Sequence, residues 1–241
     1  MYNSFMEIQI AVAKINKYAT SESGDTLEVV ERPNGGLSVV LADGQTSGRG
    51  AKVISSLVVR KVISLLADGV RDGAAARAAS DYLYTERAGK VSATLNILSA
   101  DLQTKTLVIT RNNTAPVYLA HGDQVDRLDA DSSPVGTSRN IRPSICEIPL
   151  EPGLSIVMYT DGLEDAGIRS GTHMDVCTVL EALLDDEEPS PQEIADSLLS
   201  NAIRLDEGRP NDDISVVVLR VLPNLDDGVR RMAVRLPVQP V

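Results

Sequence analysis

Apolar and polar residues alternate along several short stretches of the chain, which is the pattern of half-buried β-strands. Two of these stretches flank a Pro-Asn-Gly-Gly turn at 33–36, and the sequence therefore predicts a β-hairpin there. Another hairpin is predicted within 116–128, turning at His121-Gly122-Asp123. The expected strands cover residues 7–15, 27–32, 36–42, 91–100, 105–112, 116–128, 145–150, 154–160 and 214–222. Runs of short strands without helices between them favour antiparallel sheets over a Rossmann-type parallel sheet.

Two helices are expected between the early and the middle strands. Residues 51–69 carry apolar side chains on more than one face, which predicts a largely buried helix that Gly69 ends. Residues 73–88 have the composition of a second, more polar helix. We expect the two to pack as a pair.

A second helix pair is expected near the end of the chain. Residues 174–185 form the first helix and residues 190–208 the second. Ser190 followed by Glu193 is the signature of a capping box at the start of the latter.

The order of strands, helix pair, strands, helix pair and final strand indicates an α+β fold. Two antiparallel sheets with helix pairs outside would form a four-layer α/β/β/α sandwich in which both faces of each sheet are buried. We expect one domain over residues 1–222 and a C-terminal extension over 223–241. The alternating segment in that extension predicts either an added strand or an ordered extension onto a partner.

The composition narrows the function classes. The 241 residues carry a net charge of −11, which argues against binding to nucleic acid or to anionic membranes. No stretch reaches the roughly 18 apolar residues that a membrane span needs. The two cysteines, Cys146 and Cys177, form no CxxC or Cys/His cluster, so structural zinc is not expected. A reducing, cytoplasmic location is expected, without nucleic-acid or membrane partners.

Four short acidic segments lie where predicted strands begin or end: 21–25, 41–44, 159–162 and 211–215. None of them contains a basic residue. Carboxylates that converge at one edge of a sheet repel each other unless cations lie between them, so this pattern suggests a site for hard metal ions. The alternative for each Asp-Gly pair is a plain turn, because Asp and Gly are common turn residues.

The order of these segments resembles that of a known enzyme family. SGD, then ADG with a glycine-rich loop before a helix, then YTDGLEDAG and finally NDDISVVVL are similar to the PPM-type metal-dependent serine/threonine protein phosphatases. The closest resemblance is to their bacterial SpoIIE-like branch, with its RsbX- and RsbU-like members. It spans roughly residues 5–222, and SSPVG at 132–136 is similar to a further element of the family.

The resemblance implies a set of metal ligands. Asp43 would bridge two Mn²⁺ or Mg²⁺ ions and position the nucleophilic water. Asp25 and the carbonyl of Gly44 would bind one ion, and Asp161 and Asp212 the other. Oxygen ligands suit these ions rather than zinc or copper.

Four further residues are expected near the metals or the phosphate. Asp213 would contact the ligands rather than the ions. Glu164 would do the same, or it would simply be a carboxylate at the start of a helix. Gln45 occupies the place where many eukaryotic-type members have a histidine. Arg49 is a candidate phosphate contact at a helix N-terminus, and the alternative is a solvated loop arginine. The loop at 44–50 departs from the usual pattern of the family.

The resemblance implies a phosphoprotein phosphatase. Its metal-activated water would hydrolyse phosphoserine or phosphothreonine on a bacterial regulatory protein of the anti-sigma-antagonist type. The alternative is a catalytically silent module that binds a phosphorylated signalling partner.

Overall fold

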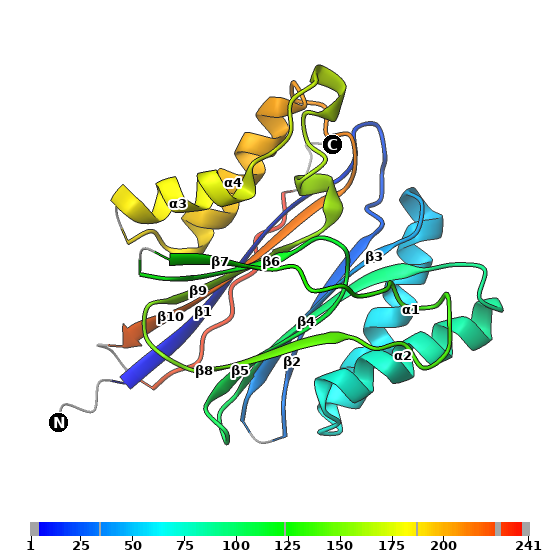
Figure 1. Cartoon of the computed structure of the whole chain (residues 1–241), viewed down its shortest axis with the longest axis horizontal. Coiled ribbons are helices and arrows are strands. Elements are labelled where there is room, and N and C mark those ends of the chain that lie inside the picture. Colours follow the sequence, from blue (N-terminus) through cyan, green and yellow to red (C-terminus); the bar gives the residue numbers. More distant parts are fainter. Residues whose placement is uncertain (1–4, 34, 123, 187, 225–227, 238–241) are drawn as a thin grey trace.

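Two five-stranded antiparallel sheets are stacked between two layers of helices (Figure 1). The computed structural model describes residues 5–33, 35–122, 124–186, 188–224 and 228–237. Both sheets and the predicted α+β class are as expected from the sequence.

The first sheet has the strand order β1-β10-β9-β6-β7. Its strands are β1 (Phe5–Ile15), β10 (Ile214–Asn224), β9 (Leu154–Tyr159), β6 (Val117–His121) and β7 (Gln124–Leu128). The longest pairing joins the two ends of the fold, because β1 and β10 are in register from Phe5↔Asn224 to Ile15↔Ile214.

The second sheet has the order β2-β3-β4-β5-β8. Its strands are β2 (Asp25–Glu31), β3 (Leu37–Gly44), β4 (Ala93–Asp101), β5 (Thr106–Asn112) and β8 (Ser144–Pro149). The interior strand β3 is buried over most of its length, whereas the neighbouring edge strand β2 is buried only at its start, around Asp25.

Each sheet has its own helix pair on its outer face (Figure 1). Helices α1 (Gly48–Ala67) and α2 (Asp72–Arg87) cover the second sheet, and α3 (Val176–Asp186) and α4 (Pro191–Leu205) cover the first. The predicted capping box is present, with the Ser190 hydroxyl and the Glu193 carboxylate each bonded to the other's backbone N–H. None of the helices in the described ranges is both long and apolar enough to cross a membrane.

Three hydrophobic clusters fill the spaces between the four layers. The middle cluster joins the two sheets through residues such as Leu41, Ile156 and Val217. The outer clusters join each sheet to its helices. This arrangement confirms the predicted four-layer sandwich.

Short turns and the chain end differ from the sequence-based picture. Two 3₁₀ turns, η1 (Asp161–Leu163) and η2 (Ile168–Ser170), follow β9. Residues 228–237 form no strand, and Arg230 in this extension donates a hydrogen bond to the carbonyl of Gly35. The sequence Pro-Asn-Leu-Asp-Asp-Gly at 223–228 also predicts a turn after β10, and residues 225–227 of it lie outside the described ranges.

Candidate metal centre

Strands β2 and β3 place two aspartates opposite each other at one end of the second sheet. Asp25 opens β2 and is the register partner of Asp43 near the end of β3. Asp25 is completely buried, whereas Asp43 is partly exposed. Like charges directly opposite each other destabilise a sheet, so this end of the sheet requires a proton or a cation.

The first sheet contributes the other two predicted ligands. Asp161 follows β9, and Asp212 lies just before β10, the neighbour of β9. The two segments approach closely at Gly162, where a Cβ atom would lie 2.3 Å from the carbonyl oxygen of Asp213. Glycine is therefore required in this Asp-Gly pair for close packing.

The carboxylate of Asp25 links the two sheets. Its Oδ2 accepts hydrogen bonds from Ser215 Oγ at 2.6 Å and from Thr160 Oγ1 at 3.0 Å, both in the first sheet's segments. Its Oδ1 is buried and has no hydrogen-bond partner. A buried carboxylate oxygen without a partner is costly, and a cation would compensate for that cost.

A cavity of about 450 Å³ lies where these segments meet. Its wall contains three of the predicted ligand aspartates, while Asp25, the register partner of Asp43, is not among the lining residues. The lining residues are Lys17, Asp43, Gly44, Gln45, Thr46, Ser47, Ser92, Ala93, Thr94, Pro134, Asp161 and Asp212.

The carboxyl groups around this cavity are difficult to ionise together. Burial, followed by repulsion from Asp25, Asp161 and Asp212, raises the pKa of Asp43 to about 9. Burial, followed by repulsion from Asp212, Asp165 and Asp25, raises the pKa of Asp161 to about 6. Burial also raises the pKa of Asp25. The repulsion that acts on Asp43 comes from the three other predicted ligands, in agreement with the register of Asp25 and Asp43 and with the lining of the cavity.

The ligands do not form a closed coordination sphere. In the described ranges, no three His, Cys, Asp or Glu side chains are grouped compactly enough to hold an ion as they stand. The aspartates surround the cavity from two sheets, and the donor set consists of oxygen atoms only, as Mn²⁺ and Mg²⁺ prefer. Together with the unpartnered Asp25 Oδ1, this donor set fits divalent hard cations.

Three lysines lie close to the acidic segments, although those segments contain no basic residue themselves. Lys14 and Lys52 both donate to the backbone carbonyl of Asp25, at 2.6 and 2.8 Å. Lys17 Nζ lies 3.7 Å from Asp212 Oδ1. The fold thus partly compensates the local negative charge with cations from other segments.

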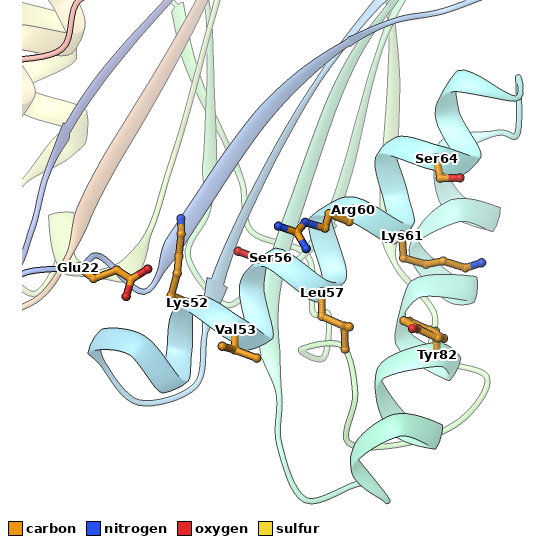
Figure 2. Close-up of a pocket in the computed structure, with 9 residues that line it drawn as sticks. All are labelled: Glu22, Lys52, Val53, Ser56, Leu57, Arg60, Lys61, Ser64 and Tyr82. Atoms are coloured by element: carbon orange, nitrogen blue, oxygen red, sulfur yellow. The ribbon is translucent and has the colours of Figure 1, made fainter.

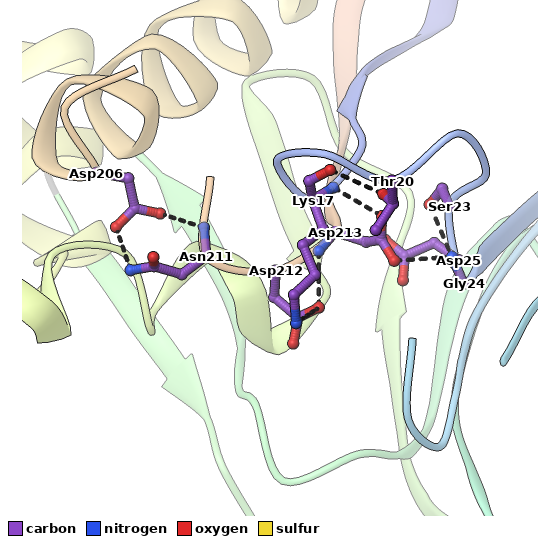
Figure 3. A network of polar contacts seen from close by, with 9 residues as sticks. All are labelled: Lys17, Thr20, Ser23, Gly24, Asp25, Asp206, Asn211, Asp212 and Asp213. Carbon is purple, nitrogen blue, oxygen red and sulfur yellow. Dashed lines mark hydrogen bonds and ion pairs between the residues drawn. The ribbon is translucent and has the colours of Figure 1, made fainter. Parts of the chain in front are cut away.

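Two further aspartates hold the loops that carry the ligands (Figure 3). Asp213 is buried and accepts hydrogen bonds from the backbone N–H groups of Lys17 at 2.9 Å and Gly24 at 2.8 Å. Asp206 accepts from both the backbone N–H and the side-chain amide of Asn211, next to Asp212. Both carboxylates act as loop anchors.

The remaining predicted site residues occupy different positions. The Gln45 side chain accepts from the backbone N–H and the hydroxyl of Ser92, at 3.0 and 3.3 Å, on the cavity wall. Glu164 accepts a hydrogen bond from the Tyr159 hydroxyl at 2.9 Å. Arg49 is exposed in the first turn of α1 and does not line the cavity.

A second, larger hollow of about 720 Å³ lies on the outer face of α1 and α2 (Figure 2). Its wall combines cationic side chains, among them Arg60 and Lys61, with apolar groups such as Val53 and Leu57. Glu22 is the acidic residue on this wall. The smaller cavity, with three aspartates on its wall, is therefore the candidate metal site.

Sequence reasoning missed several residues of the centre. Ser215 and Thr160 stand inside the recognised segments NDDIS and YTDG, so their positions were a usable signal. Lys14, Lys17 and Lys52 lie outside those segments, and only the fold brings them to the aspartates.

Comparison with known proteins assigns most of the chain to a family. A family model described as Stage II sporulation protein E (SpoIIE) matches residues 33–222. Stage II sporulation protein E of Bacillus subtilis (strain 168) is 24% identical over 200 residues, which are 83% of this chain and 24% of that protein. The chain thus spans about a quarter of the length of this curated relative.

Two solved structures show the same fold. The PP2C phosphatase domain with a fragment of the regulatory domain of SpoIIE from Bacillus subtilis has a TM-score of 0.78 and 24% identity, covering 92% of this chain and 65% of that one. The catalytic domain of the serine threonine protein phosphatase PstP, in complex with two manganese ions, has a TM-score of 0.70 and 20% identity, covering 90% and 100%. At these identities the likeness is one of fold.

Proposed function

The chain belongs to the Stage II sporulation protein E family, and from this we propose that it is a metal-dependent protein phosphatase. Its substrate would be phosphoserine or phosphothreonine on a bacterial regulatory protein. The observation that carries the proposal is that Asp43 from one sheet meets Asp161 and Asp212 from the other on the wall of one cavity, with Asp25 opposite Asp43 in its sheet.

The proposal assigns each of these residues to an ion, as the resemblance to the PPM-type phosphatases implies. Asp43 is repelled by Asp25, Asp161 and Asp212, so it lies near all three, and in this proposal it would be a ligand of both Mn²⁺ or Mg²⁺ ions. Asp25 and the Gly44 carbonyl would complete one ion's ligands, and Asp161 and Asp212 the other's. When bound, such ions lower the pKa of water and neutralise phosphoryl oxygens.

The groups around Asp25 orient its carboxylate as a metal ligand. Ser215 and Thr160 occupy Oδ2, and the two lysines hold its backbone carbonyl, so Oδ1 is left for a cation. Groups that orient a metal ligand are a general requirement of such sites.

Water is the nucleophile in this proposal. The cavity is not lined by either cysteine, and burial raises the pKa of both the Cys146 and the Cys177 thiol, which disfavours the reactive thiolate. The hydroxyls of Ser215 and Thr160 are engaged with Asp25.

The test is hydrolysis of p-nitrophenyl phosphate and of a phosphoserine protein with and without Mn²⁺. We expect activity that excess chelator abolishes and that Asp43→Asn lowers at least about a hundredfold, since removal of a key electrostatic group costs that much in many enzymes. Activity that survives chelator or Asp43→Asn would show that the two-metal mechanism is wrong.

The regulatory substrate is tested separately. A phosphorylated anti-sigma-antagonist domain and an unrelated phosphopeptide are compared at equal concentration, and we expect the folded domain to react with the higher kcat/KM. Equal values for both substrates would contradict this part of the proposal.

A further inference from the structure

Lys17 brings a positive charge to a cavity whose other charged lining residues, within the described ranges, are aspartates. Its ammonium group lies 3.7 Å from Asp212 Oδ1, beyond ordinary hydrogen-bond distance, and its side chain is 32% exposed. An exposed ion pair of this length contributes little to stability. The ammonium group therefore retains donors for another acceptor in the cavity.

The position of Lys17 is fixed by its backbone. Its N–H donates to Asp213 Oδ1 at 2.9 Å, and its carbonyl accepts from the backbone N–H and hydroxyl of Thr20, at 3.1 and 2.8 Å. Figure 3 shows these contacts beside Asp212. The anchored backbone keeps the base of this side chain at the cavity, so that only the side-chain torsions of Lys17 must be ordered when it binds an anion.

The other nearby cations have different roles. Lys14 and Lys52 are bonded to the Asp25 carbonyl, and neither lines the cavity. Arg49 is exposed outside it. A phosphate monoester that enters the cavity approaches carboxylates, which repel it, and Lys17 is the protein cation on the wall that offsets this repulsion.

We propose that Lys17 is the substrate-binding residue that donates to a phosphoryl oxygen of the phosphoprotein. This inference rests on the proposed phosphatase function. In the absence of phosphate, Lys17 pairs loosely with Asp212, and in the complex its ammonium group turns to the phosphoryl group.

The test compares Lys17→Met and Lys17→Arg with a matched control, Lys105→Met. Lys105 is exposed in the turn between β4 and β5, at the end of the second sheet opposite to Asp43. For each protein we would measure KM and kcat for p-nitrophenyl phosphate, the inhibition constant of orthophosphate, and the affinities for Mn²⁺ and orthophosphate by calorimetry.

We expect Lys17→Met to raise KM and the orthophosphate inhibition constant about tenfold or more, as for loss of a hydrogen bond to a charged group. Its Mn²⁺ affinity should be unchanged or tighter, because a cation beside Asp212 has been removed. Lys17→Arg should recover most of the phosphate affinity, and Lys105→Met should match the wild type.

Two results would overturn the inference. Unchanged orthophosphate affinity in Lys17→Met, with tighter Mn²⁺ binding, would make Lys17 a counter-ion of Asp212 only. A parallel loss of Mn²⁺ affinity would make it a structural residue. If the wild type hydrolyses nothing, the proposed function fails, while calorimetric binding of orthophosphate to wild type and variant still decides the role of Lys17.

Discussion

The two carboxylate oxygens of Asp25 have different surroundings, and this difference is the basis of a test at the scale of single residues. Oδ2 is held by two hydroxyls, whereas the buried Oδ1 has none. The hydroxyls fix the orientation in which Oδ1 would receive an ion.

Ser215→Ala should weaken Mn²⁺ binding about tenfold, because loss of a group that orients a ligand typically costs 10- to 100-fold in metal affinity. Calorimetry gives the dissociation constant. Ser64→Ala, an exposed position on α1, is the control. Equal Mn²⁺ affinity in the two variants would show that the Ser215 hydroxyl does not orient Asp25.

The raised pKa values predict how the metal-free protein responds to pH. The pKa of Asp43 is about 9 and that of Asp161 is about 6, so both carboxyl groups keep their protons in the folded state well above pH 4. In the unfolded chain an aspartate releases its proton near pH 4. The folded state therefore binds more protons above about pH 4, and the free energy of unfolding falls as pH rises toward those folded-state values.

In chelator, we expect the free energy of unfolding to fall by at least about 1 kcal/mol between pH 5 and pH 8. Urea denaturation at both pH values measures it. In Asp43→Asn the free energy of unfolding should fall less between the two pH values. Saturating Mn²⁺ should raise the free energy of unfolding of the wild type most at pH 8. A metal-free wild type that becomes more stable toward pH 8 would contradict the prediction.

At the scale of elements, the corner between β3 and α1 depends on Gly44. A Cβ atom there would lie 2.0 Å from the carbonyl oxygen of Ala51, so the first part of α1 packs directly against Gly44, whose carbonyl is a predicted metal ligand. Ala51 itself is completely buried, which leaves the helix little room to move away.

Gly44→Ala should lower the free energy of unfolding by about 1–3 kcal/mol, the usual cost of overpacking, and should also weaken Mn²⁺ binding. Gly50→Ala is the matched control, because its nearest neighbour would be 4.0 Å away and the helix favours alanine. Denaturant unfolding and calorimetry measure the two effects. A Gly44→Ala protein as stable as Gly50→Ala would refute the packing argument.

The elements were predictable to different degrees. The strands and the capping box at Ser190 were visible because periodicity and capping are local. The 3₁₀ turn at Asp161 was not, since three residues carry no period. The start of α1 at Gly48 was also missed, because glycines on either side of Arg49 suggested a loop.

At the scale of the whole molecule, the site depends on contacts between distant parts of the chain. The acidic segments were recognised from the sequence, yet the pairing of β1 with β10 and the approach of Lys17 to Asp212 arise from the tertiary fold. No local pattern encodes such contacts. The lysines near Asp25 were missed for the same reason.

Asp213 offers a test of the contacts that join the two ends of the chain at the cavity. Its carboxylate binds the loop after β1 to the start of β10 through the N–H groups of Lys17 and Gly24. Asp213→Asn replaces one accepting oxygen by an amide donor, which would face a backbone N–H. The free energy of unfolding in chelator should fall by about 1–3 kcal/mol, the cost of leaving a buried polar group unsatisfied.

Hydrogen exchange distinguishes local detachment of the loop at residues 17–24 from a general loss of stability. In Asp213→Asn, amides of residues 17–24 should exchange faster while those in β4 and β5 keep their rates, because local opening needs only this loop to detach. Asp126→Asn, on the exposed part of β7, is the control for the same chemical change. If residues 17–24 exchange at wild-type rates in Asp213→Asn, the loop is held by other contacts, and Asp213 does not close the two ends of the chain around the cavity.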